Sequence, residues 1–444
     1  MSPGQQHTAS TDIAEQTRRK ITWRLMPFLF VLYIISYLDR VNLGYASLEM
    51  TRELGFSNEV FGFGAGIFFI GYFFLEIPST ILVELWSARK WIGRIMISWG
   101  LLASLTGLIT TAHQLYWFRF FLGMAEAGFF PGIIVYLTHW YRSADRAKAI
   151  AMFMVAIPIS QIVGAPVSGL LMRLHWWGYS GWRWLLILEG VPAVILGMVT
   201  IIYLTDWPKE ARWLHDEERA WITGELEREK QTQKAIKPLS VWQALHNRDV
   251  VLLTLAAFFA LTMLYGFGFW LPKIVQGLSR RGVLQVTFLT AIPVLAALPS
   301  MLMNGWHSDR SGERRWHAAL SLLAAALLLV VSQSLDRNVS LAIVVLSGAA
   351  MGVYGYLPAF WSLPTTFLTE AAAAACIGLI NSFGNLGGFV GNYAMGFLSD
   401  KTGSYAAGVA YLAGSAIVAA ALVLSVHASR DRHKAGDSAP TIDS

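Results

Sequence analysis

The feature that most constrains this chain is its succession of long apolar runs. Six runs, at about 22–45, 59–83, 91–111, 115–140, 147–172 and 184–205, precede a charge-dense stretch at 206–248. Six more follow, at about 249–276, 283–306, 316–334, 339–368, 371–398 and 404–428. A helix needs roughly 20 apolar residues to span a bilayer, and membrane β-strands are shorter and alternate in polarity. The pattern predicts an all-α integral membrane protein with twelve transmembrane helices in two pseudo-symmetric six-helix lobes.

The composition excludes a soluble protein. Apolar residues make up 55% of the 444 residues and charged residues only 14%. A soluble domain has about 25% charged residues, so this chain cannot cover a water-facing surface. The net charge of +6 is better explained by Lys and Arg in cytoplasmic loops than by a nucleic-acid partner.

The polarity changes along the chain predict its division into segments. We expect a cytoplasmic N-terminal tail at 1–20, an N-terminal lobe at 21–205, a linker at 206–248, a C-terminal lobe at 249–428 and a cytoplasmic C-terminal tail at 429–444. The linker carries tryptophan and leucine at helical spacing among charged residues, which predicts an amphipathic helix against the membrane or the bundle.

The positive charges predict the orientation. An even number of spans leaves both termini on one side. If that side is the cytoplasm, and the linker is set aside, Lys and Arg at the cytoplasmic ends outnumber those on the other side by about two to one. We therefore expect cytoplasmic N and C termini.

A small set of ionisable residues lies inside the apolar runs. Each costs about 2.5 kcal/mol or more at the centre of a membrane helix, so such residues are candidates for function. They are concentrated in the first half of the chain and comprise Asp39, Arg40, Glu76, Arg119, Glu126 and Glu189.

Four of these residues predict an anion site with proton-binding groups. Arg40, with Tyr37 on the same helix face, suits bidentate pairing with a carboxylate. Asp39 and Glu126 would bind and release protons, because burial favours the neutral carboxyl. Arg119 is seven residues before Glu126, about 10.5 Å along one helix face, and would modulate it. The alternative is that these residues form static ion pairs between helices.

Other polar residues leave two interpretations open. Glu76, just before a proline, suits a structural place in a cytoplasmic gate, and Glu189 has no visible partner and is interpreted as structural. Gln161 and Asn381 either join helices or contact a substrate, and Trp361 belongs to a group of aromatic residues that are more often packing.

Several motifs are absent from the sequence. It has no Gly-x-x-x-x-Gly-Lys-[Ser/Thr] loop, no His-Glu-x-x-His and no Gly-x-Ser-x-Gly. ATP binding through a P-loop and the common hydrolase chemistries therefore lack their residues. We expect no enzyme activity, no cofactor and no metal.

Longer motifs carry a family resemblance that extends from about residue 18 to 428. They include Tyr-Leu-Asp-Arg-Val-Asn at 37–42, Arg-Phe-Phe-Leu-Gly-Met-Ala-Glu at 119–126, Asp-Trp-Pro-Lys-Glu-Ala-Arg-Trp-Leu at 206–214 and Gly-Leu-Ile-Asn-Ser-Phe-Gly-Asn at 378–385. The chain resembles the major facilitator superfamily, specifically the anion:cation symporter branch of tartrate, phthalate and sugar-acid transporters. The cytoplasmic loop motif of the superfamily stands at 305–315. Its first copy, near Arg89, lacks the usual aspartate.

The resemblance implies proton-coupled import of an organic anion by alternating access. In matching positions, Arg40 would bind the carboxylate, Asp39 and Glu126 would carry protons, and Arg119 would modulate Glu126. The pocket would be shaped by Tyr37, Tyr72, Gln161, Trp361 and Asn381. Gating is assigned to Glu76, Arg89, Asp309 and Arg310.

The implied partners are the anion, protons and the lipid bilayer, with the protein a monomer in the bacterial inner membrane. A tartrate-like hydroxy acid or sugar acid is the expected substrate. Aromatic acids such as phthalate or 4-hydroxyphenylacetate, an exporter or antiporter, and a transporter-like sensor are the alternatives.

Overall fold

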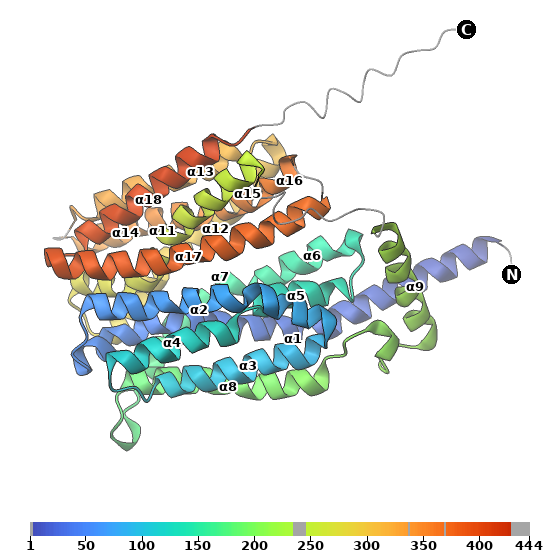
Figure 1. Cartoon of the computed structure of the whole chain (residues 1–444), viewed down its shortest axis with the longest axis horizontal. Coiled ribbons are helices and arrows are strands. Elements are labelled where there is room, and N and C mark those ends of the chain that lie inside the picture. Colours follow the sequence, from blue (N-terminus) through green and yellow to red (C-terminus); the bar gives the residue numbers. More distant parts are fainter. Residues whose placement is uncertain (1–2, 234–245, 336–337, 368–369, 428–444) are drawn as a thin grey trace, which may run out of the picture.

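The computed structural model describes residues 3–233, 246–335, 338–367 and 370–427 (Figure 1). In these residues the regular structure is helical throughout, and the long helices run side by side in one elongated bundle. The first half contains α1 (Pro3–Glu53), α2 (Asn58–Leu85), α3 (Ala88–Thr106), α4 (Ala112–Glu126), α5 (Phe129–Thr138), α6 (Ser143–Met154), α7 (Ala156–Leu171), η1 (Trp176–Gly178) and α8 (Gly181–Tyr203).

The second half follows the linker between Tyr203 and Arg248. The linker contains η2 (Pro208–Glu210) and α9 (Asp216–Gln233). The second half contains α11 (Arg248–Ser279), α12 (Val283–Ser311), α13 (Arg315–Ser332), α14 (Val339–Gly355), α15 (Leu357–Ser362), α16 (Pro364–Phe367), α17 (Glu370–Thr402) and α18 (Ala406–Leu424).

The described part of the chain contains helices for all twelve of the predicted apolar runs. Ten are long and apolar enough by length and composition, with α4–α5, α6–α7 and α14–α16 each counted as one span. The more polar α3 and the long α17, which correspond to the other two runs, lie in the same bundle.

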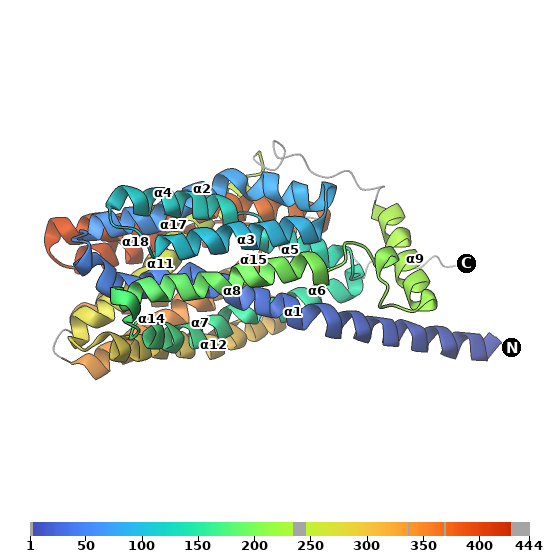
Figure 2. The same ribbon diagram turned by 90° about the horizontal axis from the view of Figure 1, so that it is seen from below.

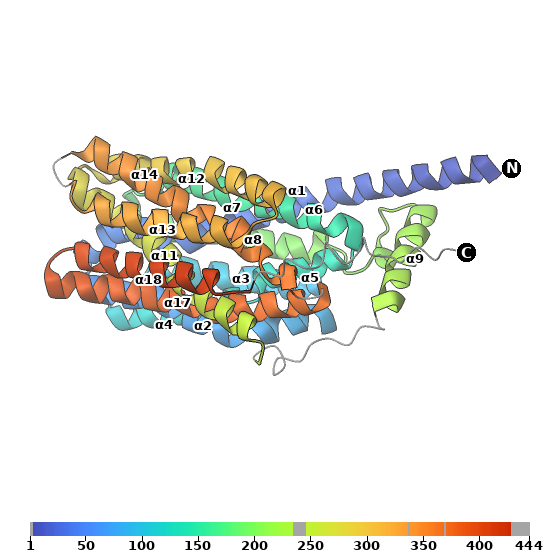
Figure 3. The same cartoon turned by 90° about the horizontal axis from the view of Figure 1, so that it is seen from above.

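The two halves meet along matched pairs of helices. α2 packs against α17, and α7 packs against α12 (Figures 1 and 3). The second span of each lobe therefore packs against the fifth span of the other lobe. The first helices of the lobes, α1 and α11, also touch at Gly44, where an added Cβ would lie 2.9 Å from the carbonyl oxygen of Phe269. A side chain at this position would therefore separate the lobes at their centre.

The first helix is longer at both ends than its apolar run. α1 begins at Pro3, so polar residues of the expected tail are helical, and they project beyond the bundle beside α9 (Figure 2). It also continues to Glu53, beyond the end of the apolar run near residue 45. The Asp39–Arg40 pair consequently lies well inside the helix and not at its end.

The fourth apolar run is interrupted, although its sequence suggests one continuous helix. α4 ends at Glu126, Gly128 adopts φ +84°, and α5 begins at Phe129 with Pro131 in its first turn. A Cβ at Gly128 would collide with the Ser79 side chain of α2. The left-handed conformation and the close approach both require glycine, so the helix breaks directly after a buried carboxylate.

The linker helix α9 packs against the end of the N-terminal lobe. Arg142 pairs with Glu225 at 3.2 Å and Lys20 with Glu218 at 2.9 Å. Partial burial raises the pKa of Glu218, but the backbone N–H of His215 and the Lys20 ammonium outweigh it and hold that pKa below its usual range. The end of the expected linker, 234–245, lies outside the described residues.

Candidate functional site

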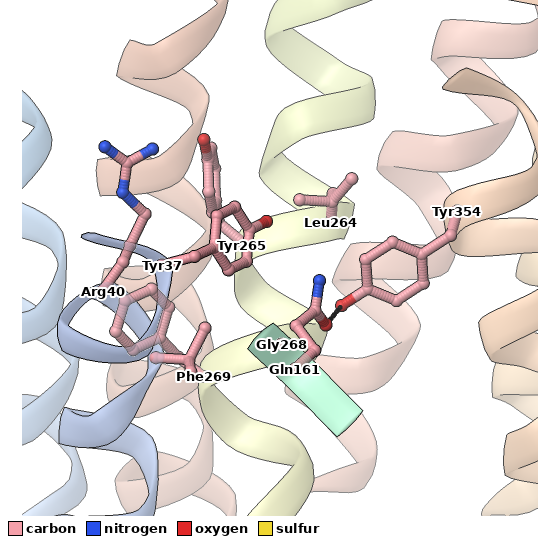
Figure 4. Close-up of a pocket in the computed structure, with 9 residues that line it drawn as sticks. Tyr37, Arg40, Gln161, Leu264, Tyr265, Gly268, Phe269 and Tyr354 are labelled. Atoms are coloured by element: carbon pink, nitrogen blue, oxygen red, sulfur yellow. Dashed lines mark hydrogen bonds between the residues drawn. The ribbon is translucent and has the colours of Figure 1, made fainter. Parts of the chain in front are cut away.

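A small pocket lies at the centre of the bundle, between the two lobes (Figure 4). Helices α1, α7, α11 and α14 each contribute to its wall. The space open to water is about 20 Å³, which is roughly enough for one water molecule. The pocket is lined by Tyr37, Arg40, Val41, Gln161, Leu264, Tyr265, Gly268, Phe269 and Tyr354.

Hydrogen-bonding groups of both lobes meet in this pocket. The Tyr354 hydroxyl of α14 donates to Oε1 of Gln161 on α7 at 3.1 Å, which joins the lobes (Figure 4). The Tyr265 hydroxyl of α11 donates to Oδ1 of Asn385 on α17 at 3.3 Å. These hydroxyls and amides give the pocket several neutral donors and acceptors beside the cation of Arg40.

Arg40 forms a buried ion pair with Glu126. Its Nε lies 3.1 Å from Oε1 of Glu126, its Nη2 contacts the same oxygen, and the Ser36 hydroxyl donates to that oxygen at 3.4 Å. The side chains are only 14% and 2% exposed, so water screens the pair little. In this conformation, therefore, the Arg40 guanidinium is already paired with the carboxylate of Glu126 and is not free to pair with another carboxylate.

Aromatic rings surround the two buried arginines. The Arg40 guanidinium lies 5.5 Å from the ring centre of Tyr72, and the Arg119 guanidinium lies 4.7 Å from that of Phe68. Arg119 is 2% exposed, and its Nε and Nη2 have no hydrogen-bond partner among the described residues. The direct partner of Glu126 is thus Arg40, while Arg119 rests on an aromatic face.

Asp39 faces the interior of the N-terminal lobe rather than the pocket. Its carboxylate accepts hydrogen bonds from Nε1 of Trp99 at 2.5 Å and from Nδ2 of Asn42 at 3.2 Å. Neighbouring positions on a helix point about 100° apart, which is why Arg40 reaches the pocket and Asp39 does not. Glu189 of α8 also lies within this lobe and accepts a hydrogen bond from Ser168 at 3.3 Å.

Glu76 of α2 also joins the two lobes. Its carboxylate accepts hydrogen bonds from Nδ2 of Asn381 at 2.6 Å and from the Ser382 hydroxyl at 2.7 Å, both on α17. Asn381 is therefore held by Glu76 and does not line the pocket. Trp361 also lies outside the pocket lining, in α15, where its ring contacts Phe360 at 5.4 Å between centres.

The remaining gating candidates each have a partner nearby in the chain or in the linker. The Arg89 side chain pairs with Asp206 at 3.5 Å, and its backbone N–H donates to Asp206 at 2.9 Å. Asp206 also accepts a hydrogen bond from the Ser87 hydroxyl at 2.7 Å. Asp309 pairs with Arg314 at 3.7 Å, and Arg310 lies over the Trp306 ring.

The lobes are also joined where α2 begins and α17 ends. The Asp400 carboxylate of α17 accepts hydrogen bonds from the backbone N–H groups of Asn58 at 3.2 Å and Glu59 at 2.7 Å. Lys273 of α11 donates to Oδ1 of Asn58 at 3.0 Å, and Tyr393 donates to Glu59 at 3.1 Å. A carboxylate at a helix N-terminus is stabilised by the helix dipole, so these contacts close this end of the lobe interface.

Of the residues predicted from the sequence, Tyr37, Arg40 and Gln161 line the pocket. Tyr265, Phe269 and Asp400 were not among the predicted residues. Tyr265 and Phe269 lie in an apolar run where aromatic residues are common, and no pattern distinguishes them there. Asp400 lies at the end of α17 and binds the start of α2. These two segments are far apart in the sequence, so their contact is known only from the way the lobes pack.

Comparisons with known proteins agree with this geometry. The sequence model of the Major Facilitator Superfamily matches residues 29–392. A putative tartrate transporter of Agrobacterium vitis is 43% identical over 94% of this chain and 95% of its own length. The inner membrane transport protein RhmT of Escherichia coli K12 is 36% identical, over 95% of this chain and 97% of its own.

Solved structures show the same fold at low sequence identity. A bacterial homologue of the human lysosomal transporter Spinster superposes with a TM-score of 0.74 at 16% identity, covering 90% of this chain and 95% of that one. A D-xylose-proton symporter superposes with a TM-score of 0.70 at 12% identity, covering 91% and 97%. The resemblance found in the motifs is confirmed: the chain is a multi-pass membrane transporter, not an enzyme, and belongs to the major facilitator superfamily.

Proposed function

We propose that this chain is a proton-coupled importer of a small organic carboxylate, with a tartrate-like hydroxy acid as its substrate. The observation that carries the proposal is the buried Arg40–Glu126 ion pair beside a pocket built by both lobes. The relatives named as putative tartrate transporters, at 43% identity, support the same substrate class.

The ion pair suggests how protons and substrate are coupled. While Glu126 is ionised, it neutralises Arg40 and competes with any external anion. A proton on Glu126 removes that negative charge and leaves Arg40 as a buried cation without a full counter-charge, which is costly. A substrate carboxylate restores the pairing through a bidentate contact with the guanidinium. Anion binding is therefore favoured when Glu126 is protonated.

The neutral groups of the pocket favour a hydroxylated acid. Gln161, Tyr265 and Tyr354 offer hydrogen bonds to hydroxyl groups, and Tyr37 stands beside them. Phe269 and the tyrosine rings would also accept an aromatic acid, so phthalate and 4-hydroxyphenylacetate remain the alternative substrates. Trp361 and Asn381 would reach a ligand only after the lobes move, since Glu76 holds Asn381 here.

Transport requires the pocket to open first on one side and then on the other. Small-molecule sites measure roughly 300–1,000 Å³, far above the water-accessible space of about 20 Å³ in this conformation. We assign the end closed by Asp400 and Lys273 to the periplasmic side, with both termini in the cytoplasm of a bacterial cell and the protein in its inner membrane as a monomer. In this scheme Asp39 is a second proton carrier, and Glu76, Arg89, Asp309 and Arg310 act at the cytoplasmic gate.

The test is uptake by liposomes that contain only the purified protein. An acidic exterior is expected to drive accumulation of labelled tartrate above its external concentration, with phthalate and 4-hydroxyphenylacetate as competing candidates. Arg40→Lys keeps the charge but loses the planar fork, and is expected to abolish accumulation. Arg94→Lys, which changes an arginine outside the pocket, is the matched control and should transport normally.

Three results would contradict the proposal. If the liposomes accumulate none of the carboxylates under an inward proton gradient, the protein does not import organic carboxylates with protons. If protons move in the direction opposite to the substrate, the protein is an antiporter or exporter. Binding without any transport would favour a sensor.

A further inference from the structure

Two neighbouring donors of α17 bind the two oxygens of one carboxylate. The amide nitrogen Nδ2 of Asn381 donates to Oε1 of Glu76 at 2.6 Å, and the Ser382 hydroxyl donates to Oε2 at 2.7 Å. The Glu76 side chain is buried, and Ser382 is buried as well. Because each oxygen has its own donor and the acceptor is charged, both hydrogen bonds belong to the stronger class. Asn381 and Ser382 therefore form a two-donor grip for a carboxylate, and in this conformation Glu76 of the other lobe supplies that carboxylate.

On α2, this grip lies close to the cation of the pocket. Glu76 follows Tyr72 by one helical turn, which is about 6 Å along the helix axis. The guanidinium of Arg40 lies 5.5 Å from the ring centre of Tyr72. The carboxylate of Glu76 is thus about one turn from the aromatic ring that Arg40 contacts.

On α17, the same grip lies close to a neutral group of the pocket. Asn381 precedes Asn385 by one helical turn, and Asn385 accepts a hydrogen bond from the Tyr265 hydroxyl at 3.3 Å. Tyr265 and Arg40 both line the central pocket. The two helices therefore agree that the grip adjoins the pocket, on the side of α2 and α17.

The protein's own carboxylates bind both groups that suit a carboxylate ligand. Glu126 pairs with Arg40, and Glu76 binds Asn381 and Ser382. Since α2 and α17 belong to different lobes, a movement that separates these helices takes Glu76 away from both donors. Buried donors without an acceptor are costly, so a carboxylate between the lobes is favoured to bind them.

We propose that Asn381 and Ser382 form a second carboxylate subsite, which binds the distal carboxyl group of a short dicarboxylate whose other carboxyl group pairs with Arg40. This inference rests on the proposed function and adds that the substrate is a diacid rather than a monoacid. Ser382 is then a substrate-binding residue. Glu76 is the internal carboxylate that binds the subsite when the ligand does not.

The first test compares two ligands that differ in one carboxyl group. Threonate has the carbon chain of tartrate, with a hydroxymethyl group in place of one carboxyl group. Titration calorimetry of the full-length protein is expected to show about tenfold tighter binding of tartrate, because the hydroxymethyl group lacks the charge that strengthens both hydrogen bonds. Phthalate and benzoate provide the same comparison for aromatic acids. Equal affinities within both pairs of ligands would overturn the subsite.

The second test removes the internal carboxylate and then one donor. Glu76→Gln is expected to raise the preference for tartrate over threonate, although the loss of a nearby negative charge alone would favour a diacid. Ser382→Ala is therefore made in the Glu76→Gln protein, where the charge no longer changes and Glu76 no longer competes for the hydroxyl. The preference for tartrate should then fall roughly tenfold. A purely structural role of Ser382 would weaken both ligands equally and leave the preference in place.

The matched control is Ser399→Ala in the same Glu76→Gln protein. Ser399 is also a buried serine of α17, but its hydroxyl donates to the Met395 carbonyl of its own helix. The preference for tartrate is expected to stay unchanged in this control. Asn381→Ala replaces Ser382→Ala if the latter cannot be purified, with the same expected fall. A preference that survives the loss of the donor would overturn the inference.

Uptake by liposomes separates this inference from the proposed function. Accumulation of tartrate under a proton gradient, together with equal binding of tartrate and threonate, would uphold the proposed importer and overturn the subsite. A preference for tartrate that depends on Ser382, in a protein that accumulates no carboxylate, would uphold the subsite and contradict the proposed coupling. Binding of none of the four acids would overturn both.

Discussion

At the scale of single residues, the site is organised by one cation with two possible partners. Arg40 binds Glu126 in this conformation, and both side chains are buried. Sequence reasoning found these two residues because ionisable groups are rare and costly inside apolar runs. Whether they bind one another was left open as the alternative of static ion pairs between helices, because Arg40 and Glu126 lie on separate helices and their distance depends on how α1 and α4 are placed in the lobe.

Replacing Glu126 by Gln tests the competition for Arg40. The variant removes the internal anion, so the apparent dissociation constant for the carboxylate substrate at pH 8 is expected to fall about tenfold, or roughly 1.4 kcal/mol. The dependence of binding on pH should also become weaker, since Asp39 is then the one remaining proton carrier of the proposed scheme. Titration calorimetry at several pH values measures both effects.

The same variant should separate exchange from accumulation. Liposomes with Glu126→Gln are expected to exchange internal for external substrate while no longer concentrating it under a proton gradient. If accumulation equals that of the wild type, Glu126 is not a proton carrier and its pairing with Arg40 is structural.

The contact between Tyr354 and Gln161 gives a second prediction at this scale. Tyr354→Phe removes a hydroxyl that donates across the lobe interface at 3.1 Å. Loss of a hydrogen bond worth about 1 kcal/mol should weaken substrate binding by roughly fivefold. Tyr356→Phe is the control, because that buried hydroxyl has no hydrogen-bond partner among the described residues. Equal effects of the two variants would remove Tyr354 from the binding site.

At the scale of helices, the apolar runs predicted where the spans lie but not how each is shaped. The length of an apolar run indicates how many residues lie in the membrane, but it does not show whether the helix is broken by a turn within that run. The break between Glu126 and Phe129 therefore went unpredicted, although Gly128 and Pro131 were visible. The full length of α1 was not predicted because its first turns are polar. A search for apolar runs does not detect a polar helical segment.

The helix break predicts a specific cost for Gly128→Ala. The left-handed conformation alone costs a non-glycine residue about 1–2 kcal/mol, and here the new methyl group also meets Ser79. Gly178→Ala is the matched control, because Gly178 has φ +78° and open space around it. Thermal unfolding in detergent should show a larger loss for Gly128→Ala. Combining it with Ser79→Gly should recover part of the difference, and no recovery would argue against the contact.

At the scale of the whole molecule, the two lobes are held by contacts that no single segment reveals. The pairs Glu76–Asn381 and Asp400–Asn58 each bring together residues more than 300 positions apart. The sequence indicates two lobes because six runs, a polar linker and six runs follow each other. Which residues meet between the lobes depends on their packing, and only the structure supplies that.

The contact of Asp400 with the start of α2 predicts a shift in the conformational equilibrium. Asp400→Asn loses the charged partner of two backbone N–H groups, so this end of the interface should open more often. Spin labels at His175 and Arg281, exposed positions on opposite lobes at this end, should report longer distances. Asp216→Asn, on exposed α9, is expected to leave the distances unchanged. An identical distribution in Asp400→Asn would show that the contact does not hold the lobes closed.

The pairing of Arg40 with Glu126 also has an electrical consequence. One positive and one negative charge that share a hydrogen bond add nothing to the net charge of the empty carrier. A charge that crosses the full membrane gains or loses about 2.3 kcal/mol per 100 mV, but a neutral pair is indifferent to that voltage. The pair itself therefore adds no voltage dependence to the return of the empty lobes, whereas a proton on Glu126 would leave the charge of Arg40 exposed to the membrane potential.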